Sequence, residues 1–296
     1  MRHPGLILRM VVAGSILFAF YLLVATAMIV AGFSLPIVAV ITLAFVGFQW
    51  KFGQWAALRS VGAEEVDEDS HPELYRTVER LSRDMDVPMP RVMVASMGAP
   101  NAFAVGRKGA GTVVVATELM QVLDDQELEG VLAHELAHIR NRDVVMMVLG
   151  QSIASLVGIV VTYAMLFGGR RNIGAYLAAW IAGSLAQMLV MVFVLAISRY
   201  REYVADADAA VALGTGDPLA RALEKIQRSN EQGQEAAAVR TPQRGHQQPA
   251  PGASKGINDN VSALCIFDAP HGLLRSIFST HPPVEKRIDR LRTGTF

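Results

Sequence analysis

Charge and cysteine are both scarce in this sequence. Only 18% of its 296 residues are charged, the 27 basic and 27 acidic residues give a net charge of zero, and there is one cysteine. A chain without excess positive charge lacks the electrostatic attraction that nucleic acids require, so we expect no DNA or RNA partner. The single thiol, Cys265, cannot form an internal disulfide and lies in no metal-ligand spacing.

The sequence contains long hydrophobic runs without charged residues. Hydrophobic residues make up 52% of the chain, which is high for a soluble protein, and they are concentrated in four uncharged blocks: 10–33, 36–50, 144–167 and 173–197. A membrane-spanning helix needs about 20 apolar residues. The first, third and fourth blocks are long enough, and the second is expected to extend to both sides of Pro36. The blocks predict two transmembrane hairpins in a lipid bilayer.

Two other interpretations of these blocks are weaker. A cleaved secretory signal is suggested by Arg2 and by the small residues at 25–27, but the apolar run continues past that point and a second block follows at once. A transporter would carry ionisable groups inside its spans, and these blocks hold none that is central. A membrane hairpin that turns at residues 32–36 fits better.

Basic residues beside the blocks predict the orientation. Because Lys and Arg are enriched on the cytoplasmic side, they place 53–142 and 198–296 in the cytoplasm. The flanking residues are Arg2, Arg9, Lys51, Arg59, Arg140, Arg142, Arg199 and Arg201. Arg170 and Arg171 oppose this assignment, since they lie in a turn expected outside. A tilted, shallow or partly spanning second hairpin is therefore an alternative.

The aqueous parts mix helices with short strands. Residues 71–88 have apolar positions at helical spacing and predict an amphipathic helix. Residues 90–96 and 111–117 are β-branched runs that predict strands, with 97–110 as a connection or a further edge strand. Asp124 and Asp125 can cap a helix that runs from about Gln126 through Asn141.

Three further segments follow the fourth block. Residues 198–214 predict a helix that ends at Gly214, and Asp217 caps another helix with Pro218 at its first position. Residues 229–258 are rich in Gln, Pro, Gly and Ala without an apolar period, which indicates a flexible linker.

The stretch "HELAH" contains the side chains with the clearest chemistry. Residues four apart lie on one helix face, so His134 and His138 can converge on one metal ion. Glu135 projects at a different angle and can reach a water molecule beside the metal, as a general base must. A surface histidine pair without a metal is the alternative.

A third ligand is expected after the fourth block, because a hydrolytic zinc site uses three protein ligands. Glu202 and Asp206 lie on one helix face that the second hairpin brings back beside the histidines. Glu202 is then the third ligand, and Asp206 can accept a hydrogen bond from a ligand histidine. Both ligand helices would continue membrane helices, and Asp208 would point away to the surface.

Four motifs in order resemble the HtpX family of membrane-embedded zinc metalloproteases: "PNAFAVGR", "HELAHIRNRD", "SRYREYVADADAA" and "STHPPVEKRIDRL". The resemblance implies a gluzincin-type endopeptidase of a bacterial inner membrane that acts on misfolded membrane proteins and binds one Zn²⁺. It matches His134, His138 and Glu202 to the zinc ligands, Glu135 to the catalytic glutamate and Asp206 to an acid behind the ligands.

Two further groups of residues are candidates for the site. His281 and Arg287 have the spacing found near the metal in similar membrane proteases, where they could stabilise an oxyanion. A helix start at His-Pro-Pro with a surface arginine is the alternative. Asn101, Ala102, Phe103 and Ala104 are expected to line the cleft, where an extended edge could hold a substrate by its main chain. A turn role is the alternative for Asn101.

The expected fold is α+β: a mostly helical integral membrane protein with two transmembrane hairpins and a cytoplasmic protease domain that contains a small β-sheet. The expected activity is hydrolysis of unfolded or misfolded polypeptides. There are two alternatives. One is a membrane protein with a structural zinc that acts as a binding or assembly module, and the other is a selective prenyl-protein-type protease.

The expected segments are an N-terminal hairpin (1–52), the first part of the protease domain (53–142), the second hairpin (143–197), the third-ligand helix with its successor (198–228), the linker (229–258) and the C-terminal part of the protease domain (259–296).

Overall fold

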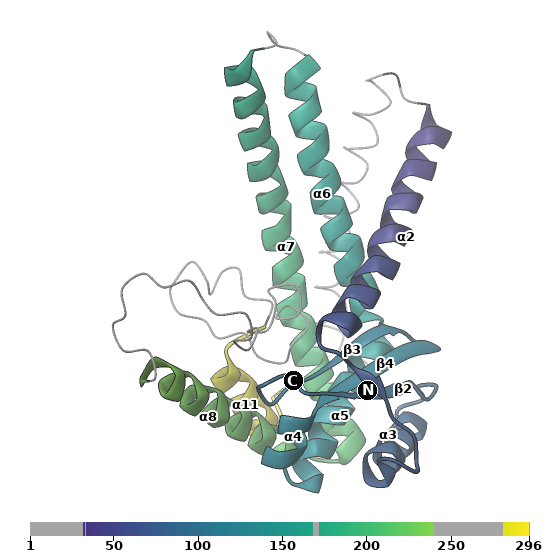
Figure 1. Ribbon diagram of the computed structural model, residues 1–296, viewed down its shortest axis with the longest axis vertical. Helices are drawn as coiled ribbons and strands as arrows, with labels where there is room; N and C mark the ends of the chain where they lie inside the picture. The colour runs from purple at the N-terminus through teal and green to yellow at the C-terminus, as the bar shows by residue number, and fades with distance from the viewer. Residues whose placement is uncertain (1–31, 33, 168–171, 240–280, 296) are drawn as a thin grey trace. The chain divides into compact units, whose positions relative to one another are not determined.

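The computed structural model describes residues 32, 34–167, 172–239 and 281–295, and the chain divides into two compact units (Figure 1). The described part of the helical unit comprises residues up to 53, 145–167 and 172–201; that of the mixed unit comprises 54–144, 202–239 and 281–295. The elements in chain order are α2 Leu35–Ser60, β1 Glu64–Glu65, α3 Pro72–Asp84, β2 Arg91–Ala95, β3 Ala102–Arg107, β4 Ala110–Ala116, α4 Thr117–Val122, α5 Asp125–Asn141, α6 Asp143–Phe167, α7 Ile173–Leu213, α8 Asp217–Val239 and α11 Val284–Thr293.

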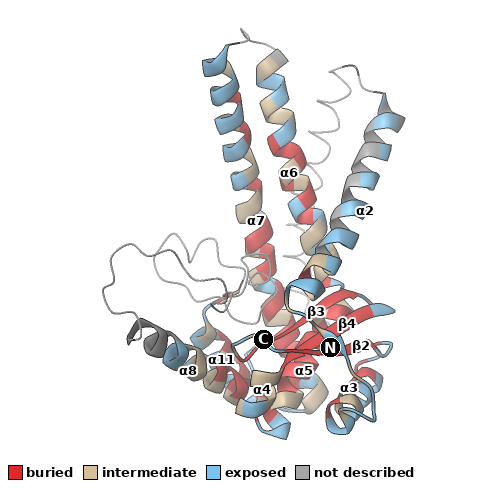
Figure 2. Ribbon diagram, viewed as in Figure 1, coloured by how far each residue is buried: buried red, intermediate tan, exposed pale blue. Residues whose placement is uncertain are grey.

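Within the helical unit, α6 and α7 run side by side (Figure 1). Ala154 and Val157 of α6 form a buried cluster with Val190 and Val194 of α7, and a Cβ at Gly183 would collide with α6. Much of their remaining surface is apolar and exposed (Figure 2). Both helices are long and apolar enough to cross a membrane. The third and fourth hydrophobic blocks are thus confirmed as helices.

The second block lies in α2, which begins at Leu35 and continues to Ser60. The helix extends beyond the block at its C-terminal end and includes one residue before Pro36. Proline suits a first helical turn because its missing N–H has no partner to lose there. The first block, apart from residue 32, lies outside the described residues, as do Arg170, Arg171 and Cys265.

The mixed unit is built on a four-stranded sheet in the order β1-β2-β4-β3. β2 pairs parallel with β4, and β3 pairs antiparallel with it, with Phe103 opposite Val114. Of the two possibilities for residues 97–110, the edge strand is therefore correct. The sequence did not predict β1, since it consists of only two exposed glutamates, Glu64 and Glu65.

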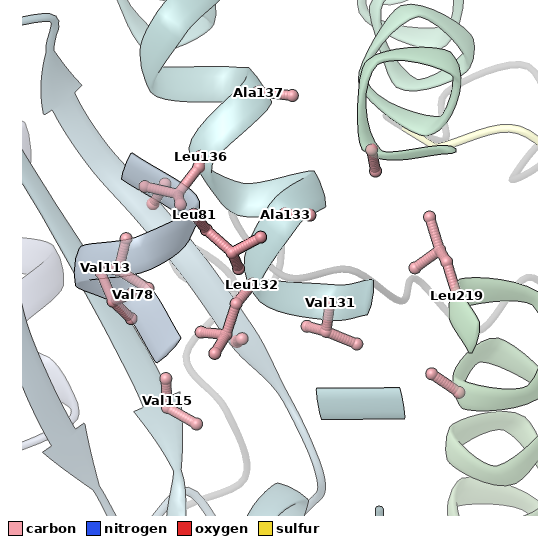
Figure 3. Close-up of a cluster of buried hydrophobic side chains, with 14 of the residues drawn as sticks. Val78, Leu81, Val113, Val115, Val131, Leu132, Ala133, Leu136, Ala137 and Leu219 are labelled. Atoms are coloured by element: carbon pink, nitrogen blue, oxygen red, sulfur yellow. The ribbon is translucent and has the colours of Figure 1, made fainter. Parts of the chain in front are cut away.

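α5 is buried between the sheet and α8. Figure 3 shows Leu132 and Leu136 on the side of the sheet, near Val113, whereas Val131 points toward Leu219 of α8. These side chains belong to one buried cluster, and burying each large aliphatic group contributes about 1.5–3 kcal/mol. α5 and α8 also approach closely, because a Cβ at Gly130 would meet the Leu219 backbone. This packing fixes the position of the "HELAH" helix between the sheet and α8.

The two ends of α5 are closed in different ways. Asp124 is its N-cap, as predicted: its Oδ1 accepts from the Glu127 N–H at 3.0 Å, and Glu127 Oε2 accepts from the Asp124 N–H at 3.0 Å. At the other end Arg142 adopts the left-handed conformation, with φ at 57°, and α6 begins at Asp143. The expectation that both ligand helices continue membrane helices is thus correct for α7, which is one helix of 41 residues, and wrong for α5.

Several segment ends differ from expectation, and the helix expected over 71–88 spans only Pro72–Asp84. The predicted strand at 111–117 stops at Ala116, because Thr117 begins the short helix α4. α8 continues to Val239, so residues 229–239 of the predicted linker are helical. The run "QEAAAV" explains this, since Ala, Glu and Gln favour a helix even without an apolar face to bury.

Candidate metal centre

The two histidines of α5 converge, as the spacing predicts. His134 Nε2 lies 3.0 Å from His138 Nε2, and the ring planes are nearly perpendicular at 88°. His134 is buried and His138 is mostly so. α5 thereby directs two nitrogen donors to one point.

The third donor comes from α7. Glu202 Oε2 lies 3.5 Å from His134 Nε2, and Glu202 Oε1 lies 3.5 Å from His138 Nε2. One ligand atom from each of the three residues lies within 4.8 Å of the others, so the set can hold a single ion. Two imidazoles and one carboxylate are a ligand set that catalytic zinc takes, with a fourth position left for water.

The partners of the two histidine Nδ1 atoms show why a cation fits between the Nε2 atoms. His134 Nδ1 lies 3.0 Å from Asp206 Oδ1, and His138 Nδ1 lies 2.6 Å from Asp143 Oδ2. An ionised carboxylate only accepts hydrogen bonds, so each Nδ1 donates, and a neutral ring then turns the lone pair of Nε2 inward. Because the two Nε2 atoms lie 3.0 Å apart, their lone pairs repel unless a cation or proton lies between them.

Arg287 of α11 is fully buried behind the ligands. Its Nε and Nη2 donate to the two oxygens of Asp206 at 2.9 and 2.7 Å, and its Nη1 lies 3.1 Å from Glu202 Oε2. Such a bidentate pair fixes both partners strongly. Arg287 offsets the negative charge of Glu202 and Asp206, and its Nη2 also lies 3.3 Å from His134 Nε2.

His281 approaches the other carboxylate oxygen of Glu202, with its Nδ1 3.1 Å from Oε1. The structure therefore brings both His281 and Arg287 to the metal ligands, as the "STHPPVEKR" spacing suggested. Their role as oxyanion donors stays a prediction.

Asp206 and Asp208 differ in surroundings. Asp206 is buried against His134 and Arg287. Asp208 accepts a hydrogen bond from Asn141 Nδ2 at 2.8 Å, which ties the end of α5 to α7. Asp208 was expected to point away to the surface, but this hydrogen bond keeps it half-buried.

Glu135 is buried beside the ligands and is not one of them. Burial raises the pKa of its carboxyl, although the nearby His138 and His134 act in the opposite direction.

The pKa of the His134 imidazolium is also raised. Burial and Arg287 lower this pKa, but the hydrogen bonds to Asp206 and Glu202 outweigh them and raise it to about 9. A bound cation would displace that proton.

The segment "NAFA" begins the edge strand. Asn101 is buried; its Oδ1 accepts from the Ala102 N–H at 2.9 Å and its backbone carbonyl accepts from the Ala116 N–H at 2.8 Å. Ala102 and Ala104 face one hydrophobic cluster and Phe103 faces another. These four side chains are buried, and the role of this segment in substrate binding stays a prediction.

A buried His-His-Glu set on two helices, in a chain with helices able to span a membrane, defines the class: a membrane-bound zinc metalloprotease. A family model described as peptidase family M48 matches residues 68–295. The chain belongs to this family, among its HtpX proteases.

Named relatives agree with this assignment. The chain is 54% identical over 96% of its length, and all of the relative's, to a "Protease HtpX homolog" of the archaeon Halobacterium salinarum. A protein of the same description from Burkholderia lata is 38% identical over 84% of this chain and 85% of its own. Because such relatives occur in archaea as well as bacteria, family membership does not imply a bacterial inner membrane.

A solved structure shares the fold. The crystal structure of S. mikatae Ste24p superposes with a TM-score of 0.54 over 96% of this chain, at 17% sequence identity. The chain spans 64% of the length of that protein. The likeness confirms a mostly helical fold with a small sheet, which here has four strands of mixed direction.

Proposed function

We propose that this metalloprotease is an endopeptidase that hydrolyses misfolded or damaged membrane proteins, with Glu135 as its general base. The observation that carries the base assignment is a buried carboxylate next in sequence to the ligand His134 and outside the ligand set. Burial raises the pKa of Glu135, which makes its carboxylate a stronger proton acceptor at neutral pH.

The proposed reaction moves one proton twice. Bound zinc supplies Lewis acidity, which polarises a carbonyl and makes water more acidic. Glu135 takes a proton from water as the water oxygen attacks the scissile carbonyl carbon. When the C–N bond breaks, Glu135 returns that proton to the leaving amine. His281 would donate a hydrogen bond to the carbonyl oxygen as negative charge develops on it. Arg287 is fully buried against Asp206 and Glu202, so its part would be to hold these two carboxylates in place.

Strand β3 is the proposed substrate-binding element. In the part of the chain that the structure describes, β3 pairs with β4 alone, so its other edge can accept an added strand. Main-chain hydrogen bonds depend little on the substrate's side chains. An enzyme that binds this way needs an extended, and hence unfolded, substrate segment. This supports misfolded proteins as the substrate class.

A selective prenyl-protein-type protease is the alternative in specificity. A peptide that ends in a prenylated cysteine and its unprenylated counterpart should be cleaved at similar rates by the proposed broad endopeptidase. A strong preference for the prenylated peptide would favour the alternative.

A structural zinc site is the other alternative. It would leave Glu135 without a purpose at this position.

The substrate class can be tested with purified protease in proteoliposomes. A helical membrane protein and a variant of it with a destabilising core substitution should differ in cleavage rate by at least about tenfold, since proteolysis follows the population of open chains. A zinc chelator should stop the reaction and added zinc should restore it. Equal cleavage of the folded and the destabilised protein would contradict the proposal.

We also propose that the metal centre faces the cytoplasm, as the flanking basic residues predict. In a Cys265→Ser background, Asp69→Cys and Asn172→Cys place single thiols at exposed positions of the mixed unit and at the start of α7. An impermeant maleimide should label Asn172→Cys in right-side-out vesicles, and Asp69→Cys only after permeabilisation. Labelling of both thiols from one side would show that the second hairpin does not span the membrane.

A further inference from the structure

We propose that Asp143 is a positioning residue of the metal centre, whose carboxylate holds the His138 ring in the tautomer that presents Nε2 to the cation. The Asp143 Oδ2 atom lies 2.6 Å from His138 Nδ1, and the two side chains are only 9% and 15% exposed. This inference concerns metal binding and does not depend on which substrate the enzyme cleaves.

The tautomer follows from the chemistry of the pair. A neutral imidazole carries its proton on one of two nitrogens, and only the other can bind a metal. An ionised carboxylate accepts hydrogen bonds and donates none, so its position beside Nδ1 keeps the proton there. A carboxylate behind a ligand histidine also increases the basicity of the ligating nitrogen. Asp206 stands in the same relation to His134.

The backbone at Arg142 makes this contact possible. In a continuous helix, residues five apart are separated by about 140° around the axis, so Asp143 would point away from His138. Instead α5 ends at Asn141, and Arg142 adopts φ 57°, a left-handed conformation that residues other than glycine seldom take. The chain changes direction there, and the Asp143 carboxylate returns to the His138 ring.

A purely structural role is the competing explanation. Asp143 is the first residue of α6, where a negative charge stabilises the helix through its dipole. That role concerns folding alone. It predicts no preference between the two nitrogens of His138, and no change in zinc affinity beyond what loss of folded protein would cause. The two explanations therefore differ in measurable ways.

Zinc affinity, measured by competition with a chelator of known affinity, is the first test. Asp143→Ala should weaken zinc binding by about 10- to 100-fold. Asp143→Asn keeps an acceptor oxygen of the same reach and should lose less. Asp84→Ala, which removes an exposed carboxylate at the end of α3, is the matched control and should bind as wild type does. Wild-type affinity in Asp143→Ala would overturn the proposal.

The tautomer is read directly from ¹⁵N shifts of histidine-labelled, zinc-free protein in detergent, with His138 assigned by substitution. Wild-type His138 should carry its proton on Nδ1, and Asp143→Ala should show a mixture. Arg142→Val, which disfavours the left-handed backbone, should reproduce the loss of affinity, whereas Arg142→Gly should not. An unchanged tautomer in Asp143→Ala, together with lower thermal stability of the zinc-free protein, would assign the residue a structural role and overturn the proposal.

Discussion

Glu135→Gln is expected to lower cleavage of an unfolded substrate by about a hundredfold to ten-thousandfold, the usual contribution of a general base. Glutamine has nearly the same shape as glutamate, but its amide cannot take a proton from water. Zinc content should remain, because the ligand atoms come from His134, His138 and Glu202. Hydrolysis of a casein-type substrate and metal analysis of the same preparation measure both quantities.

Stability separates loss of chemistry from loss of fold. The pKa of Glu135 is raised in the folded protein, so at neutral pH its ionised form costs stability that a neutral side chain does not. Zinc-free Glu135→Gln should therefore unfold at the same temperature as wild type or a higher one. Glu129→Gln, on the same helix and paired with Arg80 at 2.9 Å, should leave cleavage unchanged. A Glu135→Gln enzyme that cleaves at nearly wild-type rate would refute the base assignment.

Local periodicity made part of the metal centre predictable from the sequence. One helical turn separates His134 from His138, so their convergence follows from helix geometry alone. Asp124 was predictable as a cap because capping depends on residues within one turn. Glu202 required a second step, namely that a hairpin returns α7 to α5, and the four ordered motifs supported that step.

Asp143 could not be predicted in the same way. Its contact with His138 depends on a left-handed residue at Arg142, and nothing in the stretch "RNRDV" signals that conformation, since glycine is the residue that usually adopts it. The extent of Arg287's contacts was also hidden, because α11 is far from α5 and α7 in sequence. Such tertiary contacts carry no sequence period.

The short elements were missed for a related reason. β1 has two residues, too few to show the alternation that identifies a strand. The end of α8 lacks an apolar period, so the sequence predicts a linker there, whereas the helix continues to Val239 through residues of high helix propensity. A hydrophobic period appears only where one face of an element is buried. Elements that bury few residues therefore cannot be identified from it.

Glu202→Gln should weaken zinc binding by more than about a hundredfold, beyond the usual loss for a residue that only positions a ligand. The amide oxygen is neutral and a poor zinc ligand, while the volume of the side chain is kept, so no cavity forms. Protease activity should disappear with the metal. Competition with a chelator gives the affinity, and Glu224→Gln, which alters a pair with Arg292 outside the metal ligands, is the control.

The shift in unfolding temperature on adding zinc gives a second measure of how much Glu202 contributes to zinc binding. Zinc at a thousand times its dissociation constant should stabilise the wild type by about 4 kcal/mol, whereas Glu202→Gln should show little shift in unfolding temperature at that concentration. If Glu202→Gln keeps wild-type affinity, the third donor must be another side chain. His281 is then the first to test, because its Nδ1 lies 3.1 Å from Glu202 Oε1, and His281→Ala should abolish binding in that case. If Glu202 is the ligand, His281→Ala should instead retain most of the zinc affinity and lose cleavage, which separates binding the metal from stabilising the oxyanion.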